Sequence, residues 1–220
     1  MSENIVVPEE LALFENLLVF ADSILKTNFF ASTKTALSFR LNPAFLRKEE
    51  FPEPLFGMFM VIGSEFRGFH LRFQDIARGG IRVIQSRNAQ VYDNNLRSLF
   101  DENYNLALTQ QRKNKDLVEG GAKERKELCC CVSFLKNSFV VQGAILMRAE
   151  ASSAEAFVAF KKYISAILDL LASSPEIVDR LRAQEILFFG PDEGTADFMD
   201  WASQVWCFLT GFFSGNEFFF

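Results

Sequence analysis

Apolar residues recur at helical spacing in three long stretches of the chain. This pattern predicts helices over Pro8–Lys26, Gln90–Gln111 and Ser153–Leu171. The third stretch has the clearest pattern, with Ser153 as the predicted N-cap. Its predicted buried stripe is formed by Phe157, Phe160, Ile164, Leu168 and Leu171. A further helix is expected to begin near Ala196, after the glycine-containing stretch GPDEGT.

Shorter apolar runs between these helices have the length and composition of β-strands. The predicted strands are Lys34–Leu41, Phe56–Ile62, Phe66–Phe73, Leu128–Phe134, Phe139–Met147 and Glu185–Phe189. Gly63-Ser64 is typical of a hairpin turn between two of them, and Lys136-Asn137 of a turn between two others. Because strands and helices alternate, we expect an α/β fold with a mixed, partly antiparallel sheet flanked by helices.

Composition and charge narrow the class of protein. The net charge of −5 over 220 residues disfavours a general nucleic-acid binder. No apolar stretch is long enough for a membrane span, and the N-terminus does not resemble a signal peptide. The adjacent cysteines Cys129–Cys131 lack metal-ligand spacing, so we expect reduced cysteines and no metal site. His70, the only histidine, alternates with apolar neighbours and is expected to be structural.

Three segments combine glycine with charge and are candidates for chemistry. They are Arg78-Gly79-Gly80, the stretch from Lys113 to Lys123, and GPDEGT with Asp192. Each follows a predicted strand or helix, where loops of α/β folds build sites. Three cations in one cleft would bind a small dicarboxylate and could lower the pKa of one lysine, which could then act as a general base. On residue types alone, two other interpretations are also compatible with these segments. They could be solvated loops, or residues 112–126 could form an anion-binding or RNA-binding surface.

Four blocks carry a resemblance to a known family: EFRGFHLRFQDIARGGIR, LFDENYNLALTQQRKNKD, EGGAK and EILFFGPDEGTADFMDWA. In this order they resemble the large NAD-specific glutamate dehydrogenases, within the superfamily of glutamate, leucine, phenylalanine and valine dehydrogenases. The resemblance implies a substrate-binding and oligomerisation domain over residues 1–202. Residues 124–150 diverge from the pattern, and residues 203–220 form an atypical phenylalanine-rich tail.

The resemblance also implies roles for individual residues. Lys123 falls on the family's catalytic lysine and Asp192 on its catalytic aspartate. Arg78 and Lys113 fall on cations that bind the substrate carboxylates. The implied reaction is oxidative deamination of L-glutamate to 2-oxoglutarate and ammonia with NAD. A homo-oligomer in the cytoplasm or mitochondria is also implied, with no nucleic-acid or membrane partner.

Two local departures from the family pattern and one missing fingerprint qualify the implied function. Val118 stands two residues before the paired glycines, where the family tends to have proline. Glu124 stands directly after Lys123, where the family usually has glycine, and a neighbouring carboxylate tends to raise a lysine pKa. No G-x-G-x-x-G fingerprint of a dinucleotide-binding domain occurs. We therefore expect a chain truncated before its NAD domain and inactive in isolation. The alternative is a non-catalytic homologue that acts as an interaction or oligomerisation module.

Overall fold

The helices of the chain agree with those that the apolar periodicity predicts. A computed structural model describes residues 8–73, 77–113, 139–140, 142–172, 174–183, 185, 187–192 and 195–209. Its α-helices are α1 (Pro8–Ser23), α2 (Ala89–Lys113), α4 (Ser153–Leu171) and α5 (Met199–Leu209), with 3₁₀-helices η1 (Pro43–Phe45) and η3 (Ala196–Phe198). The predicted helices are confirmed, although α1 ends at Ser23 because a strand follows. The predicted boundary at residue 202 falls inside α5, and the division into domain and tail stays a prediction.

The N-cap of α4 is Ser152, so the prediction of Ser153 was wrong by one residue. Ser152 has extended backbone angles, and its hydroxyl accepts a hydrogen bond from the Glu155 N–H. The Glu155 carboxylate in turn accepts from the Ser152 N–H at 2.7 Å. Two adjacent serines look alike in sequence, but only Ser152 stands three residues before a glutamate and so completes a capping box.

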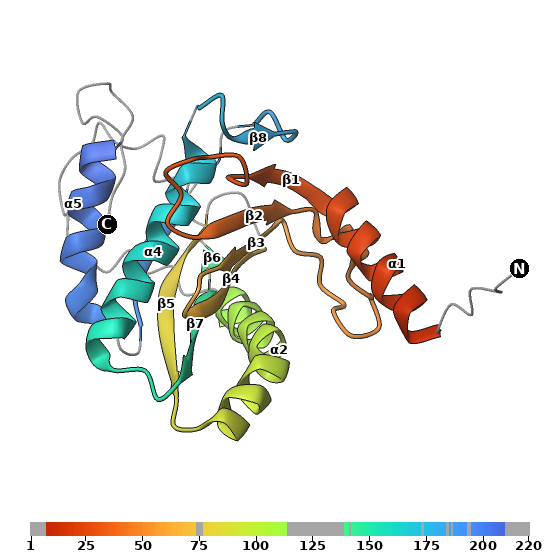
Figure 1. Cartoon of the computed structure of the whole chain (residues 1–220), viewed down its shortest axis with the longest axis horizontal. Coiled ribbons are helices and arrows are strands. Elements are labelled where there is room, and N and C mark those ends of the chain that lie inside the picture. The colour runs from red at the N-terminus through yellow and green to blue at the C-terminus, as the bar shows by residue number, and fades with distance from the viewer. Residues whose placement is uncertain are drawn as a thin grey trace, which may run out of the picture.

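Among the described residues, nine strands form one mixed sheet (Figure 1). They are β1 (Ile24–Thr27), β2 (Leu37–Leu41), β3 (Gly57–Ile62), β4 (Phe66–Arg72), β5 (Ala77–Ser86), β6 (Phe139–Val140), β7 (Gln142–Ala149), β8 (Val178–Asp179) and β9 (Phe188–Pro191). The predicted strands around β2, β3, β4 and β6–β7 are confirmed, as is the β3–β4 hairpin. The strands β1 and β8 were not predicted. The predicted strand Leu128–Phe134 and the turn at Lys136-Asn137 lie outside the described residues.

The sheet changes from antiparallel to parallel at β7, toward one end of the strand order. Strands β1 to β4 pair antiparallel in chain order, and β4 pairs antiparallel with β7. β5 is then parallel to β7, β6 and β9. This confirms the mixed α/β sheet. The parallel part collects segments that are more than a hundred residues apart in sequence, so it can assemble a site from separate motifs.

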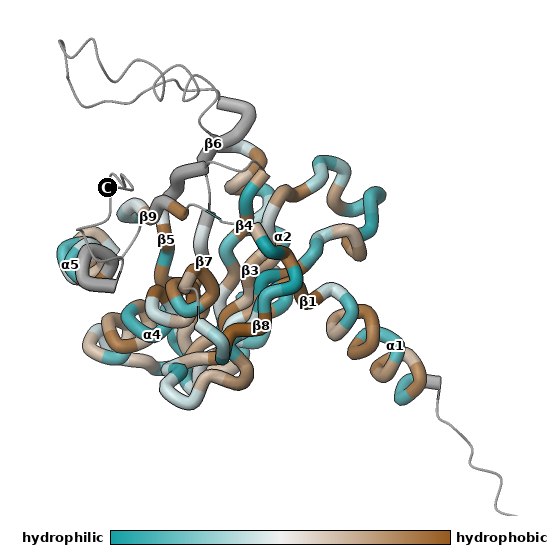
Figure 2. Tube along the Cα trace, turned by 90° about the horizontal axis from the view of Figure 1, so that it is seen from above, coloured by the Kyte–Doolittle hydropathy of each residue, from teal (hydrophilic) through white to brown (hydrophobic). Residues whose placement is uncertain are grey.

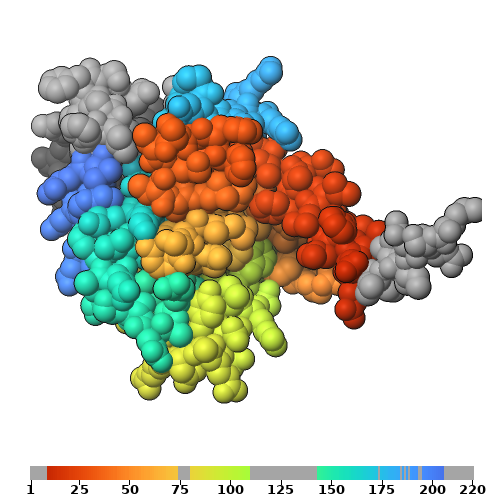
Figure 3. Space-filling model, in the orientation of Figure 1, coloured from red at the N-terminus to blue at the C-terminus, as the bar shows by residue number. Residues whose placement is uncertain are grey.

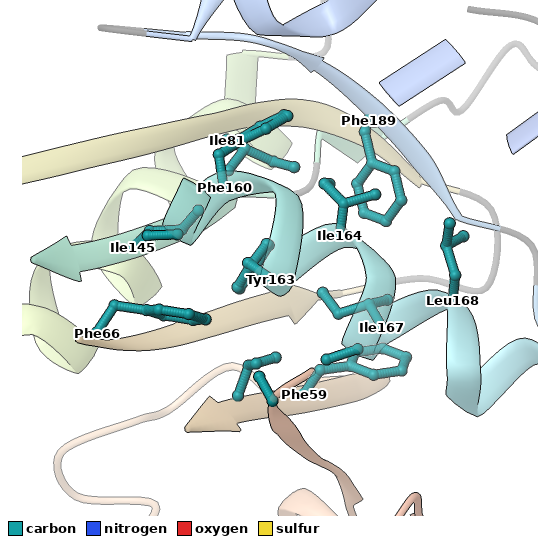
Figure 4. Close-up of a cluster of buried hydrophobic side chains, with 14 of the residues drawn as sticks. Phe59, Phe66, Ile81, Ile145, Phe160, Tyr163, Ile164, Ile167, Leu168 and Phe189 are labelled. Carbon is teal, nitrogen blue, oxygen red and sulfur yellow. The ribbon is translucent and has the colours of Figure 1, made fainter. Parts of the chain in front are cut away.

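Two apolar cores lie on opposite faces of the sheet. On one face α4 packs its predicted stripe onto the sheet, and Figure 4 shows Phe160, Ile164 and Leu168 around the same core as Phe59, Ile81 and Phe189. On the other face Tyr104 and Ala107 of α2 pack on Leu71 and the neighbouring strands. Each fully buried Leu, Ile or Phe side chain contributes about 1.5–3 kcal/mol, so packing of these two helices stabilises the sheet on both faces.

Helix α1 buries little of its apolar surface against the described residues. Figures 2 and 3 show it standing at the periphery of the packed body. Its exposed apolar side chains are Leu11, Leu13, Phe14, Leu17, Leu18 and Val19. The helix follows local periodicity, but its burial cannot be deduced from that pattern.

His70 is fully buried beneath β9, as expected for a structural histidine. Its ring stands edge-on to Phe59 and Phe189, with ring centroids 5.9 and 5.4 Å away. Neither ring nitrogen has a hydrogen-bond partner among the described residues. Burial, reinforced by the nearby Arg72 charge, lowers the pKa of His70 from 6.5 to about 3. The folded protein therefore keeps this side chain neutral.

The free energy of unfolding is expected to fall as the pH drops below the ordinary histidine pKa. An unfolded chain protonates His70 below pH 6.5, whereas the folded chain does so only near pH 3. The contribution of neutral His70 to the free energy of unfolding is therefore complete above pH 6.5. Between pH 6.5 and about 3 it decreases by up to about 1.4 kcal/mol per pH unit. Urea denaturation across this window measures the effect. His70→Leu should flatten the slope between the two pKa values, and an unchanged slope in that variant would contradict the assignment.

Candidate functional site

The glycine pair next to Arg78 lies inside a strand. Arg78, Gly79 and Gly80 belong to β5, so the expectation of a loop was wrong. β5 is paired along both edges here: Arg78 is opposite Val140 of β6 and also opposite Phe188 of β9. Glycines usually weaken a strand, and inside one they often mark a place where another chain segment approaches closely. That approaching segment is β9, where Gly80 is opposite Gly190.

Asp192 lies directly against Gly80, immediately after β9. A Cβ atom added to Gly80 would stand 2.6 Å from the Asp192 Cβ and 2.9 Å from the Pro191 carbonyl oxygen. Real side chains do not approach so closely, and here the obstacle includes backbone. Only glycine at position 80 therefore lets the aspartate sit on β5. Two segments that are distant in sequence, ARGGIR and GPDEGT, meet at this contact.

Thr195 joins the Asp192 segment to β5 through its hydroxyl. The Asp192 N–H donates to the Thr195 Oγ1 at 3.0 Å, and that hydroxyl donates to the Ile81 carbonyl at 2.6 Å. Thr195 is fully buried. This residue was not singled out from the sequence, although it is the last letter of GPDEGT. A hydroxyl residue just after a glycine, at a helix start, was the available signal.

Arg82 provides the charge that faces Asp192. Its Nη2 lies 3.8 Å from the Asp192 Oδ1, and both side chains are roughly one-third exposed, 30% and 28%. At this distance and exposure the ion pair contributes at most about 1 kcal/mol to stability. A solvent-accessible carboxylate can exchange a proton with a ligand more readily than a fully buried one.

A buried charge cluster lies beneath the start of β9. Glu185 Oε1 accepts hydrogen bonds from Arg40 Nε at 2.8 Å and Arg72 Nη2 at 2.5 Å. All three side chains are almost fully buried. Both guanidinium groups also stand over the Phe59 ring. The cluster links the segment leading into β9 to β2 and β4, and none of its three residues was among the predicted site residues. Charged letters inside the runs SFRL, HLRF and EILFF were the signal.

The other predicted site residues are located only in part. The Arg78 backbone lies in β5, and Lys113 is the last residue of α2, but their side chains are outside the description. Lys123 lies outside the described residues. The structure therefore places Arg78 in β5 and Asp192 directly after the neighbouring strand β9, and the two lysines stay predictions. Within the described ranges, no group of His, Cys, Asp or Glu side chains could hold a metal ion. No helix in those ranges is long and apolar enough to cross a bilayer.

Comparison with known proteins gives matches along most of the chain. The family model "Bacterial NAD-glutamate dehydrogenase, catalytic domain" matches residues 3–219. "Glutamate dehydrogenase 2" of Dictyostelium discoideum is 54% identical over 192 residues, 87% of this chain and 16% of that protein. The NAD-specific glutamate dehydrogenase of Neurospora crassa is 54% identical over 84% of this chain and 16% of its own length. That of Saccharomyces cerevisiae is 47% identical over 89% and 17%. The chain thus spans about a sixth of these relatives.

Proposed function

Because this chain belongs to the NAD-dependent glutamate dehydrogenase family, whose catalytic-domain model matches residues 3–219, we propose that it supplies substrate-side residues for glutamate oxidation. The proposed reaction converts L-glutamate, NAD and water into 2-oxoglutarate, ammonia and NADH. The chain would contribute the glutamate-binding cations and the proton-transferring groups of that site.

One observation carries the proposal. Asp192 lies against Gly80, so the GPDEGT aspartate and the ARGGIR strand meet although 111 residues separate them in sequence. A half-buried carboxylate beside a strand that carries arginines suits proton transfer to a bound substrate. The cations would bind the carboxylates of the substrate, and the aspartate would transfer a proton at the substrate's amino group. The Asp192 side chain is 28% exposed and lies 3.8 Å from Arg82 Nη2, so it is accessible and has a cation nearby.

Binding of glutamate is assigned to cations. Arg78 and Lys113 would each meet a carboxylate of the substrate, since a dianion needs two positive partners in a partly desolvated site. Arg78 lies in β5 and Lys113 is the last residue of α2. These assignments rest on the resemblance, and the side-chain geometry stays a prediction.

Chemistry after carbon–hydrogen cleavage is assigned to Lys123 and Asp192. Loss of hydride from the α-carbon leaves an iminium on the substrate. Lys123 would take a proton from water, which attacks that carbon. Asp192 would then give a proton to the nitrogen so that it leaves as ammonia, and the carbinol oxygen loses its proton to become the 2-oxo group.

NAD supplies the hydride acceptor in this reaction when bound. The described residues contain no strand–G-x-G-x-x-G–helix unit, and the sequence has no such motif. The residues present therefore do not fit the dinucleotide, and we assign none of them to it. A homo-oligomer and a cytoplasmic or mitochondrial location also remain predictions.

The proposed function is tested by NADH formation in the full-length protein. We expect the NADH absorbance to increase with time when L-glutamate is the substrate. The rate should be far lower with L-leucine, L-phenylalanine or D-glutamate. Absence of glutamate-dependent NADH would refute the proposal and favour a non-catalytic homologue. A Lys123→Ala variant that kept full activity would contradict the role given to that lysine.

A further inference from the structure

Beyond the strand, the Asp192 backbone is hydrogen-bonded to Thr195, through its N–H to the Thr195 hydroxyl and through its carbonyl to the Thr195 N–H. The β5–β9 pairing ends at Ile81 opposite Pro191, one residue before Asp192. The Asp192 N–H then donates to the Thr195 hydroxyl at 3.0 Å. Because the strand pairing has ended, the contacts with Thr195 and the fit against Gly80 help to hold the aspartate on β5.

The Thr195 hydroxyl donates its single proton to a backbone carbonyl of β5. Its oxygen stands 2.6 Å from the Ile81 carbonyl oxygen but 3.2 Å from the Asp192 carbonyl oxygen. One hydroxyl donates one hydrogen bond, so the shorter contact to Ile81 takes it. The hydroxyl thereby accepts from Asp192 and donates to Ile81, which fastens the segment after β9 to the strand that carries Gly80.

Thr195 does not make the side-chain hydrogen bond that is usual for a helix N-cap residue. Thr195 stands at the N-cap of η3, where a threonine hydroxyl normally accepts a hydrogen bond from the first turn. No such side-chain cap bond is made here. The hydroxyl points instead to Asp192 and Ile81, in a fully buried position. Helix capping therefore does not account for a threonine at this position.

We propose that Thr195 is a positioning residue for Asp192, holding the aspartate on β5 through its hydroxyl bridge to Ile81. The inference rests on the proposed function, since it gives Asp192 a proton-transfer role. Thr195 itself touches no reacting atom. Its effect passes through the Asp192 backbone, so it should govern kcat more than glutamate binding.

The test compares Thr195→Val, which removes the hydroxyl at nearly constant shape, with Thr195→Ser, which keeps it. In the full-length protein, Thr195→Val is expected to lower kcat about 10–100-fold with a smaller change in KM, as for a misplaced catalytic group. Thr195→Ser should restore most of the rate. Ser203→Ala is the matched control, because among the described residues its hydroxyl bonds to carbonyls of α5 itself.

Two further readouts separate positioning from a general structural role. In an Asp192→Asn background, Thr195→Val should cost little additional kcat, because residues acting as a unit are not additive. Amide hydrogen exchange at Asp192 should accelerate in Thr195→Val and not in Ser203→Ala. Thr195→Ala serves the same comparison if valine prevents folding.

The inference is overturned if the two losses of kcat simply multiply, or if exchange at Asp192 does not change. The exchange measurement needs no turnover. Wild-type protein without glutamate-dependent NADH formation would thus refute the proposed function, while exchange would still decide whether Thr195 holds Asp192.

Discussion

Asp192→Asn is expected to lower kcat for glutamate oxidation by about 10³-fold, the range of a lost general acid–base group. Asparagine has nearly the same shape, so the contact with Gly80 and the N–H bond to Thr195 persist. What disappears is the ability to carry a proton. The loss of the Arg82 ion pair contributes little, because that pair is long and about one-third exposed.

Steady-state kinetics with L-glutamate measure this effect, and KM should change far less than kcat. Asp200→Asn is the matched control: it is an exposed aspartate in the first turn of α5, eight residues farther along the chain. Its kcat should match the wild type. If Asp192→Asn kept wild-type turnover, Asp192 would be a structural carboxylate and the proposed mechanism would lose its proton donor.

Glu185→Ala is expected to lower the free energy of unfolding by about 3–5 kcal/mol, as for removal of one partner from a buried ion pair. The carboxylate is shared by Arg40 and Arg72, and all three side chains are almost fully buried. Without it, two guanidinium groups near one Phe59 ring lose their common counter-charge. Glu185→Gln should cost less, because an amide oxygen still accepts a hydrogen bond.

Chemical denaturation measures this loss. Glu50→Ala provides the control, because Glu50 pairs with Arg47 at 2.6 Å while their side chains are 50% and 73% exposed. That change should alter the unfolding free energy by less than about 1 kcal/mol. Similar losses in the two variants would mean that the Glu185 cluster is no more stabilising than a surface ion pair.

The secondary structure was predictable where the pattern is local. Helices α2 and α4 show 3.6-residue periodicity, and the β3–β4 hairpin has its turn marked by Gly63-Ser64. Strand β5 was missed as a strand because glycines at positions 79 and 80 disfavour one in isolation. Pairing on both edges, by segments 62 and 110 residues farther along the chain (Arg78 with Val140 and Phe188), overrides that local preference.

The candidate site divides in the same way. Asp192 could be picked out from GPDEGT together with the family resemblance, since a motif is a local string of letters. Its neighbours could not be, because Gly80, Ile81 and Arg82 belong to another motif and reach Asp192 only through the β5–β9 pairing. Thr195 lies within the motif, but its hydrogen bond crosses to β5.

By itself, then, the sequence determined the family, the α/β class and the main helices, and it made Asp192 a candidate site residue. Only the tertiary structure decided that Asp192 packs against Gly80 and that the Thr195 hydroxyl links Asp192 to Ile81. It also decided that Glu185 pairs with both Arg40 and Arg72. The physical reason is that periodicity and motifs report interactions among near neighbours in the chain. Close approach, burial and charge pairing depend on which distant strands lie side by side, and that is settled only when the whole sheet packs between its helices.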